Sequence, residues 1–309
     1  MKLSVHTLLN GAVDYAGLFP PAGLDMASAV RNYSRYVSGE DAWALGRFVV
    51  PVSRLEEFNF HVQAHALEER TRARNAEGRG ESWSLSALSD GDLGPDLDRV
   101  KQFNRWHGER DERPRVNIDA IEVKVASKEA ISAARKLLSD SLRVFFEVPV
   151  EGEPDALLSA IAAARGAAKV RTGGASHEMA PTAQALVGFF DACLRHGVRF
   201  KATGGLHHPL CKALATDPGA PGRPHVTHGF LNVLLTAAFL YDGMSSEEAL
   251  AVATEQSAGE FPFDDVGVEW KGHRLTAEAM SVIRRDFAVS FGSSSFEEPM
   301  AGLRRLKLC

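Results

Sequence analysis

The sequence predicts an α/β protein whose parallel strands close into a (β/α)8 barrel. Two observations favour this fold. The chain has 309 residues, and a barrel of this kind usually takes about 250 residues, with insertions adding more. Short apolar runs also recur along the chain and alternate with stretches of helical spacing, which is typical of a parallel sheet.

The expected strands are short apolar runs separated by helical segments. One is expected within residues 1–20, and the others at 47–52, 83–88, 118–125, 143–150, 167–172, 198–203 and 287–291. Alanine- and leucine-rich segments connect several of them and have the spacing of amphipathic helices, for example 156–165 and 182–196. Closure into a barrel is the simplest arrangement for eight such strands.

Residues 206–267 do not follow this alternation. They begin with a proline-rich stretch and continue into two helical segments, so we predict a single barrel domain over residues 1–309 with an insertion of helices between strands 7 and 8. The segment 226–241 is apolar nearly all round, so it is either buried against the barrel or part of a subunit contact in a homo-oligomer. The next helix opens at Ser245 with Glu248 three residues later, a capping-box pattern.

Composition limits the classes of partner. Hydrophobic residues make up 45% and charged residues 24%, which is ordinary for a soluble domain. A net charge of -5 argues against general binding to nucleic acid or to a membrane surface. The N-terminus lacks an apolar signal core, and the most apolar run, 230–241, is shorter than the ~20 residues needed to span a bilayer. We therefore expect a cytoplasmic protein. The three cysteines form neither a disulfide framework nor a zinc ribbon.

Strand parity predicts which side chains point into the barrel. Outward positions pack on helices and should be apolar, whereas inward positions near the carboxyl ends of the strands can carry polar groups. In the four expected strands from 118 to 203, the apolar residues occupy one parity. The predicted inward side chains are Glu122, Lys124, Glu147, Lys169, Arg171, Lys201 and Thr203.

This interior would hold four cations and two carboxylates. Isolated buried charges are costly, so they should pair or shift their pKa values. An excess of positive charge suits an anionic substrate and lowers the pKa of one lysine, and an enclosed neutral amine forms imines with carbonyl compounds. Lys169 and Lys201 therefore indicate carbonyl chemistry; the alternative is an ion-pair network that only fills the barrel.

Four motifs follow one another in the second part of the chain. They are 142–147 (LRVFFE), 169–173 (KVRTG), 200–205 (FKATGG) and 290–295 (SFGSSS). In order and approximate spacing they resemble the motifs of the deoxyribose-phosphate aldolases, which are class I aldolases on a (β/α)8 barrel. The resemblance covers roughly residues 117–307, with a long insertion after Gly205.

The resemblance implies a role for several residues. Lys169 corresponds to the family's imine-forming lysine and Lys201 to its proton-transfer partner, while Glu147 matches a glutamate on the fifth strand. The last-strand turn, with Ser293 and Ser294, corresponds to a turn that helps to bind the substrate phosphate.

Two departures from the family pattern concern residues of the expected site; the second strand also lacks the family's common cysteine, and the N-terminal half matches poorly. The nearest match to the family's catalytic aspartate is Asp119, but parity places Asp119 opposite Glu122 and Lys124. Either a bulge intervenes, or the role has moved to Glu122. Arg171 stands where the family has a small residue, so it either accepts a carboxylate or crowds out the family's substrate.

We therefore expect a class I (Schiff-base) aldolase or lyase that acts, without a cofactor, on a small anionic carbonyl compound such as a sugar phosphate or a keto acid. The expected catalytic residues are Lys169, Lys201, Glu147, Glu122 and Lys124. Backbone N–H groups at glycine-rich turns and nearby hydroxyls can bind an anion. The expected substrate-binding residues are Arg171, Gly173, Gly174, Thr203, Gly204, Gly205, His207, His208, Ser293 and Ser294.

Two other functions remain open from the sequence. His207 and His208 follow the seventh strand, with His225 and His228 further on, and imidazoles of this number can hold zinc in a metal-dependent hydrolase or lyase. The barrel could also bind a small molecule without catalysis. Asp14 lies in an unusual aromatic and proline-rich stretch, where it either faces the site or belongs to a rigid closure of the barrel.

Overall fold

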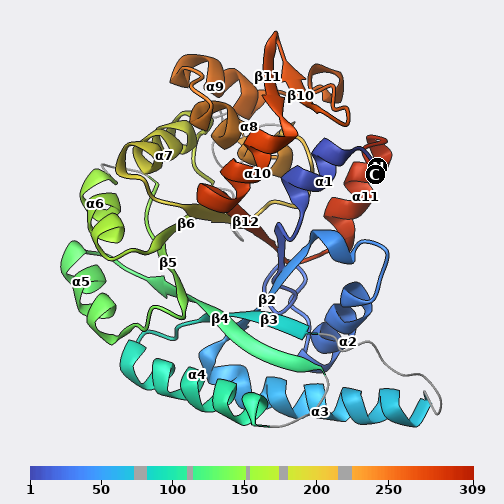
Figure 1. Cartoon of the computed structure of the whole chain (residues 1–309), viewed down its shortest axis with the longest axis vertical. Helices are drawn as coiled ribbons and strands as arrows, with labels where there is room; N and C mark the ends of the chain where they lie inside the picture. Colours follow the sequence, from blue (N-terminus) through green and yellow to red (C-terminus); the bar gives the residue numbers. More distant parts are fainter. Residues whose placement is uncertain (73–81, 110–113, 151–153, 174–179, 215–224) are drawn as a thin grey trace.

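The barrel predicted from the sequence is present in the computed structural model, which describes residues 1–72, 82–109, 114–150, 154–173, 180–214 and 225–309. Eight parallel strands form a closed sheet (Figure 1). Around the barrel their order is β1 (Val13–Tyr15), β2 (Leu45–Pro51), β3 (Ser82–Leu88), β4 (Arg115–Lys124), β5 (Arg143–Glu147), β6 (Ala167–Arg171), β7 (Phe200–Thr203) and β12 (Ala288–Ser293). Barrel strands that follow one another in the sequence are therefore neighbours in the sheet, as in other (β/α)8 barrels.

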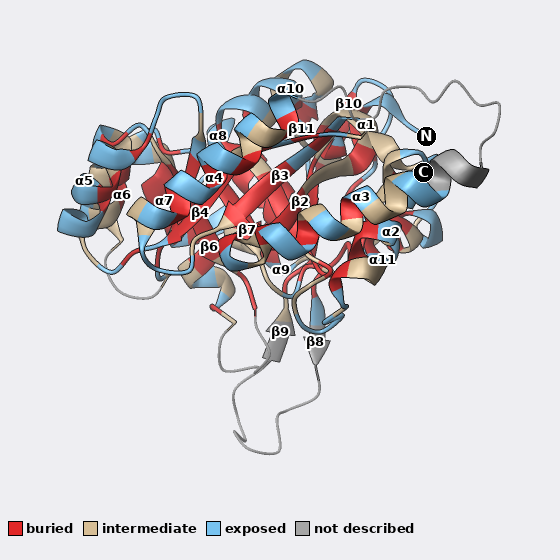
Figure 2. Ribbon diagram, turned by 90° about the horizontal axis from the view of Figure 1, so that it is seen from below, coloured by how far each residue is buried: buried red, intermediate tan, exposed pale blue. Residues whose placement is uncertain are grey.

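Helices surround this sheet and leave their outer faces exposed, while the strands are largely buried (Figure 2). The helices outside the segment between β7 and β12 are α1 (Leu3–Leu9), α2 (Met26–Val37), α3 (Leu55–Arg72), α4 (Leu93–Gly108), α5 (Lys128–Leu137), α6 (Asp155–Ala163), α7 (Ala183–His196) and α11 (Glu297–Arg305). Short 3-10 turns occur at η1 (Ala42–Ala44), η2 (Val52–Arg54) and η4 (Ala258–Glu260).

The segment between β7 and β12 carries additional elements. They are an antiparallel pair, β8 (Lys212–Leu214) and β9 (His225–Thr227), then α8 (Phe230–Tyr241) and α9 (Ser246–Thr254), a second antiparallel pair, β10 (Gly267–Trp270) and β11 (His273–Thr276), and α10 (Ala277–Asp286). The capping box predicted at the start of α9 is confirmed, because the Ser245 hydroxyl accepts from the Glu248 N–H while the Glu248 carboxylate binds back to Ser245.

Helix α8 is apolar on all sides because the chain itself covers all of it except its end. Residues 230–240 are all buried, and the helix contacts α7, α9 and strand β12. Of the two environments expected for this segment, burial within the chain accounts for its composition. Among the residues that the structure describes, no helix is long and apolar enough to cross a membrane.

Local signals position strand β7, which carries Lys201. Helix α7 begins at its N-cap Thr182, whose side chain accepts from Ala185 N–H, and ends at Gly197, which adopts the left-handed conformation (φ 64°). That conformation favours glycine and turns the chain back toward the sheet. Phe200 then stacks on Phe190 with ring centroids 4.6 Å apart, which anchors the outward face of β7.

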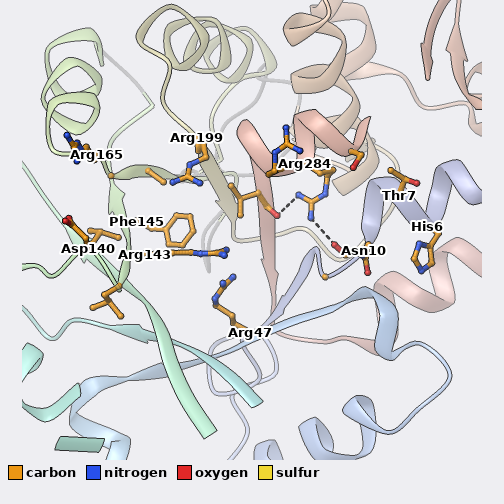
Figure 3. A pocket seen from close by; sticks show the side chains of 18 residues that line it. His6, Thr7, Asn10, Arg47, Asp140, Arg143, Phe145, Arg165, Arg199 and Arg284 are labelled. Atoms are coloured by element: carbon orange, nitrogen blue, oxygen red, sulfur yellow. Dashed lines mark hydrogen bonds between the residues drawn. The ribbon is translucent and has the colours of Figure 1, made fainter. Parts of the chain in front are cut away.

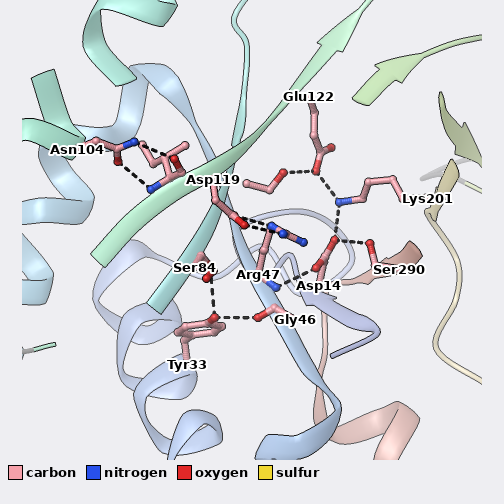
Figure 4. Close-up of polar contacts among 12 residues, drawn as sticks. Asp14, Tyr33, Gly46, Arg47, Ser84, Asn104, Asp119, Glu122, Lys201 and Ser290 are labelled. Carbon is pink, nitrogen blue, oxygen red and sulfur yellow. Dashed lines mark hydrogen bonds and ion pairs between the residues drawn. The ribbon is translucent and has the colours of Figure 1, made fainter. Parts of the chain in front are cut away.

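A β-bulge explains the position of Asp119 relative to Glu122. Leu85 pairs with Ile118 but Ser86 pairs with Ala120, so Asp119 is an extra residue in β4. One extra residue reverses the alternation of side chains along a strand. The bulge anticipated as one of two explanations is therefore present, and it lets Asp119 and Glu122 both bond to groups from other barrel strands (Figure 4).

Candidate functional site

Five charged side chains form a continuous series of ion pairs inside the barrel, which we call the ion-pair chain: Glu147, Lys169, Glu122, Lys201 and Asp14. The Lys169 Nζ lies 2.7 Å from Glu147 Oε2 and 2.8 Å from Glu122 Oε2. The Lys201 Nζ lies 2.7 Å from Glu122 Oε1 and 2.6 Å from Asp14 Oδ2 (Figure 4). Each ammonium group thus lies between two carboxylates.

Strand register brings these groups together. Glu147 pairs with Lys169 across β5 and β6, and Lys169 pairs with Lys201 across β6 and β7. Asp14 comes from β1 on the far side of β12. It reaches Lys201 because β12 carries a small residue between them, Ser290, whose hydroxyl donates to Asp14 at 2.8 Å. The chain therefore spans the width of the barrel interior.

Two of the carboxylates also accept hydrogen bonds from uncharged groups. The Ser86 hydroxyl donates to Glu122 Oε1 at 2.8 Å, and the Arg47 backbone N–H donates to Asp14 Oδ1 at 2.8 Å. These contacts matter because a buried charge is costly unless ion pairs and hydrogen bonds satisfy it. Sequence reasoning missed Ser86 and Ser290, whose only signal was a hydroxyl within an expected strand.

Exposure increases along the ion-pair chain from one end to the other. The side chains of Asp14 and Lys201 are each 1% exposed, and that of Glu122 is 3% exposed. Exposure rises to 7% at Lys169, 15% at Glu147 and 43% at Arg171. Lys169 is therefore the lysine of the pair that lies nearer to solvent, at the carboxyl ends of the strands where barrel enzymes hold their sites.

Burial and charge set the pKa values of the deepest groups. Burial alone would raise the pKa of Glu122, but the ammonium groups of Lys169 and Lys201 outweigh it and hold that pKa well below its usual range. Burial alone would lower the pKa of Lys201, but Asp14 and Glu122 raise it above its ordinary value. Lys201 is therefore a fixed cation at neutral pH and not a free nucleophile.

The expected excess of cations in the interior is wrong. Asp14 adds a third carboxylate, so three carboxylates face two ammonium groups within the ion-pair chain. Lys124 ends β4 with an exposed side chain and makes no ion pair with any described residue. It therefore does not join the cluster in which it was expected. The positive charge on Lys169 is balanced by its neighbours before any substrate arrives.

Arg171 extends the site toward solvent. Its Nη1 lies 4.0 Å from Glu147 Oε1, at the limit of an ion pair. Its Nε is buried and has no hydrogen-bond partner among the described residues. The charge of this guanidinium group is only weakly balanced by Glu147, and its Nε–H has no acceptor among the described residues. Both properties suit contact with an anionic ligand group.

The glycine-rich turns after β6 and β7 lie against each other. Gly204 and Gly205 adopt positive φ angles of 88° and 76°, which residues with a Cβ rarely adopt. A Cβ on Gly204 would lie 2.3 Å from the carbonyl oxygen of Gly173, so only glycine fits there. The Thr172 hydroxyl donates to the Gly204 carbonyl at 2.6 Å and joins the two turns. Gly174 lies outside the described residues.

The last barrel strand adds hydroxyl groups near His207. The Ser293 Oγ lies 3.3 Å from His207 Nδ1, and the same nitrogen is 2.9 Å from Glu298 Oε2. Ser294 is 6% exposed, and its Oγ is buried without a hydrogen-bond partner among the described residues. Thr203 ends β7 and pairs with Gly292 in the neighbouring strand β12. These groups follow the carboxyl ends of β7 and β12, where substrate contacts were expected.

The alternative histidine constellation is not assembled by the described residues. Buried His228 contacts the Pro181 carbonyl through Nε2 at 2.8 Å, and His207 contacts Glu298. Burial, together with the charges of Lys212 and His207, lowers the pKa of His208. The side chain of His225 lies outside the described residues. Over the described part of the chain, no group of three or more His, Cys, Asp or Glu side chains is placed to hold a metal ion.

From the sequence, Asp14 either faces the site or belongs to a rigid closure of the barrel. It faces the interior, is fully buried, and closes the ion-pair chain. Asp119, the nearest match to the family's aspartate, instead forms a two-bond pair with Arg47, at 2.6 Å to Nε and 2.7 Å to Nη2. The sequence signal for this inward carboxylate was a single aspartate between Val13 and Tyr15, in a short apolar stretch.

Comparisons with known proteins add no assignment. No protein-family model matches the chain, and no curated protein or solved structure is significantly similar to it. The resemblance to the deoxyribose-phosphate aldolases therefore stays a prediction from four motifs.

Proposed function

We propose that the protein is a Schiff-base aldolase or lyase that acts on a small anionic carbonyl compound, with Lys169 as the imine-forming residue. The observation that carries this proposal is the difference between the two lysines. Lys201 is fully enclosed and held as a cation, whereas Lys169 is the lysine nearer to solvent and lies within 2.8 Å of two carboxylates. This pairing provides a nucleophile together with acceptors for its proton.

The steps of imine formation balance with these groups. The Lys169 ammonium transfers one proton to Glu147, and the neutral amine attacks the carbonyl carbon of the substrate. The resulting carbinolamine loses its hydroxyl as water after Glu147 returns the proton. The products are water and a protonated imine on Lys169, and Glu147 is again a carboxylate. The 2.7 Å contact between the two residues gives the proton its path.

The protonated imine then accepts the electron pair of the breaking C–C bond. In the cleavage direction, Glu147 takes the proton of the β-hydroxyl group as the second carbonyl product forms, and an enamine remains on Lys169. Glu122 holds Lys169 from the other side, and Lys201 keeps Glu122 ionised through a 2.7 Å contact. Lys201 acts in this scheme as a fixed charge that orients its neighbours.

An anionic substrate group is the best match to the entrance. The Nε of Arg171 and the buried hydroxyl of Ser294 have no hydrogen-bond partner among the described residues, and both groups lie with the Gly204 backbone at the carboxyl ends of the strands. Guanidinium, hydroxyl and backbone N–H groups are the common donors to phosphate and carboxylate oxygens. A sugar phosphate and a keto acid are therefore the first substrates to test.

Borohydride trapping tests the imine. The protein is incubated with glyceraldehyde 3-phosphate, acetaldehyde or pyruvate, reduced with sodium borohydride, digested and analysed by mass spectrometry. We expect at least one compound to leave a reduced adduct on Lys169 and none on Lys124, the exposed lysine at the end of β4. Lys169→Arg should abolish the adduct while circular dichroism stays unchanged.

The opposite results would refute the proposal. An absence of any adduct on Lys169 across the panel, or equal labelling of Lys124, removes the imine. If thermal-shift measurements then still show stabilisation by phosphates or keto acids, the barrel binds its ligand without this chemistry.

A further inference from the structure

A charged cavity opens at the end of the barrel opposite to the candidate site, at the amino ends of the strands. It has a volume of about 630 Å³ and is lined by six arginines that we call the arginine pocket: Arg47, Arg143, Arg165, Arg199, Arg284 and Arg285. Figure 3 labels Arg47, Arg143, Arg165, Arg199 and Arg284, which come from different segments of the chain and surround one cavity. The size lies within the range of small-molecule sites, which is about 300–1,000 Å³.

Three of these arginines are not held by a hydrogen bond or an ion pair within the described part of the chain. The side chains of Arg143, Arg165 and Arg199 make no hydrogen bond and no ion pair with any described residue. Arginine side chains usually meet carboxylates, and planar guanidinium groups that converge on one space are a common arrangement for binding oxyanions. Their five donors each are thus available to a ligand.

The other cations of the pocket are held in place by the protein. Arg47 pairs with Asp119, Arg285 pairs with Asp286, and Arg284 donates to the backbone carbonyls of Ala288 and Val289. Although burial lowers the pKa of Arg284 to about 10, this side chain stays charged at neutral pH. The Nε of Arg284 is buried without a partner among the described residues.

Acidic groups do not neutralise the pocket. Asp140 is the acidic side chain among those that line it, and it already pairs with Arg135. The arginine pocket is therefore locally cationic in a chain whose net charge is -5. A concave, local excess of this kind concentrates small anions, whereas a nucleic acid would need an extended basic track.

We propose that the arginine pocket binds a small multivalent oxyanion, a molecule carrying several phosphate or carboxylate groups. Arg143 and Arg199 provide the main contacts, because both are unpaired and begin or immediately precede barrel strands at the floor of the pocket. This site is separate from the ion-pair chain and does not depend on the function proposed for it.

Isothermal titration calorimetry with inorganic tripolyphosphate and with citrate tests the site and separates phosphate from carboxylate recognition. We expect the intact protein to bind at least one of them with one-to-one stoichiometry. Arg143→Gln and Arg199→Gln should each weaken binding about tenfold, and the double variant should abolish it. Because neither side chain makes a hydrogen bond or an ion pair with a described residue, both variants should keep the thermal unfolding midpoint.

Two controls keep the test specific. Arg31→Gln removes one exposed charge on α2 outside the pocket and should leave the affinity unchanged. Arg171→Gln, which removes the anion contact proposed at the opposite end of the barrel, should also retain binding and so exclude that end. The proposal is overturned if the intact protein binds neither anion, or if the Arg143→Gln/Arg199→Gln double variant binds as tightly as the intact protein.

Discussion

The two ends of this barrel carry charge in opposite ways. In the ion-pair chain, each ammonium group lies between two carboxylates and is almost completely enclosed. In the arginine pocket, three guanidinium groups have no partner among the described residues, and all three are exposed. The difference follows from solvation, because an enclosed charge must be paired, whereas an exposed one can stay unpaired in water.

One thin apolar layer separates the two ends. It consists of Ala120, Phe145, Ala167 and the partly buried Val289. On one side, the Lys201 Nζ lies 5.2 Å from the centroid of the Phe145 ring; on the other, Phe145 lines the arginine pocket. The enclosed charges are thus fixed by their ion-pair partners, whereas Arg143, Arg165 and Arg199 make no hydrogen bond or ion pair with a described residue.

The largest expected effect of breaking this arrangement is on stability at Glu122. Glu122→Gln removes the carboxylate between Lys169 and Lys201 and leaves two enclosed ammonium groups facing each other. Removing one partner of a buried pair typically costs about 3–5 kcal/mol. We expect a loss of this size in the free energy of unfolding, measured by urea titration followed by circular dichroism.

Glu147→Gln is the matched variant at the solvent end of the same series. Its side chain is 15% exposed, so water can replace part of the lost interaction, and we expect a loss of only about 1 kcal/mol. Equal losses in the two variants would contradict the gradient of enclosure along the ion-pair chain.

The second effect is a dependence of stability on pH that Glu122 causes. Its folded-state pKa is lowered, so the stability it contributes is present above the unfolded pKa of about 4.3 and is lost as the pH falls through the folded value. One titrating group contributes at most about 1.4 kcal/mol per pH unit. We expect the unfolding free energy to decline from pH 5 downward more steeply in the intact protein than in Glu122→Gln.

The sign at high pH is opposite. The folded-state pKa of Lys201 is raised, so its contribution is fully present below the unfolded pKa of about 10.4 and is lost as the pH rises through the folded value.

For the acid-side prediction at Glu122, the control is Glu278→Gln, which removes an exposed carboxylate and should leave the acid slope unchanged. An identical acid slope in the intact protein and Glu122→Gln would show that Glu122 does not carry this linkage.

The strand positions and the inward lysines could be predicted because period-two alternation depends only on local sequence. Lys169 and Lys201 both point inward, and Phe200 packs outward. Asp119 could not be placed in this way, since a single bulge residue reverses the alternation without a clear signal in the sequence. The aromatic stretch around Asp14 gave no parity, because strand β1 has only three residues, all of them buried.

The arginine pocket could not be predicted at all. Its arginines lie in strand β2, at or near the starts of other strands and in helix α10, and they are spread along the chain from Arg47 to Arg285. Only closure of the barrel brings them together. Sequence parity sorts neighbours along one strand, but it does not show which strand ends lack a compensating carboxylate.

The smallest expected effect is the change in the free energy of unfolding when single arginines of the pocket are replaced. Arg143→Gln and Arg199→Gln remove no internal contact and relieve repulsion between guanidinium groups, so each should change the unfolding free energy by less than about 0.5 kcal/mol, with a gain where it is measurable. The gain should appear at low salt and vanish at high salt, because ions screen exposed charges beyond about 10 Å at 0.1 M. Urea titrations at two ionic strengths measure it. A salt-independent loss would mean that these arginines hold the fold together, and the contrast between the two ends of the barrel would then fail.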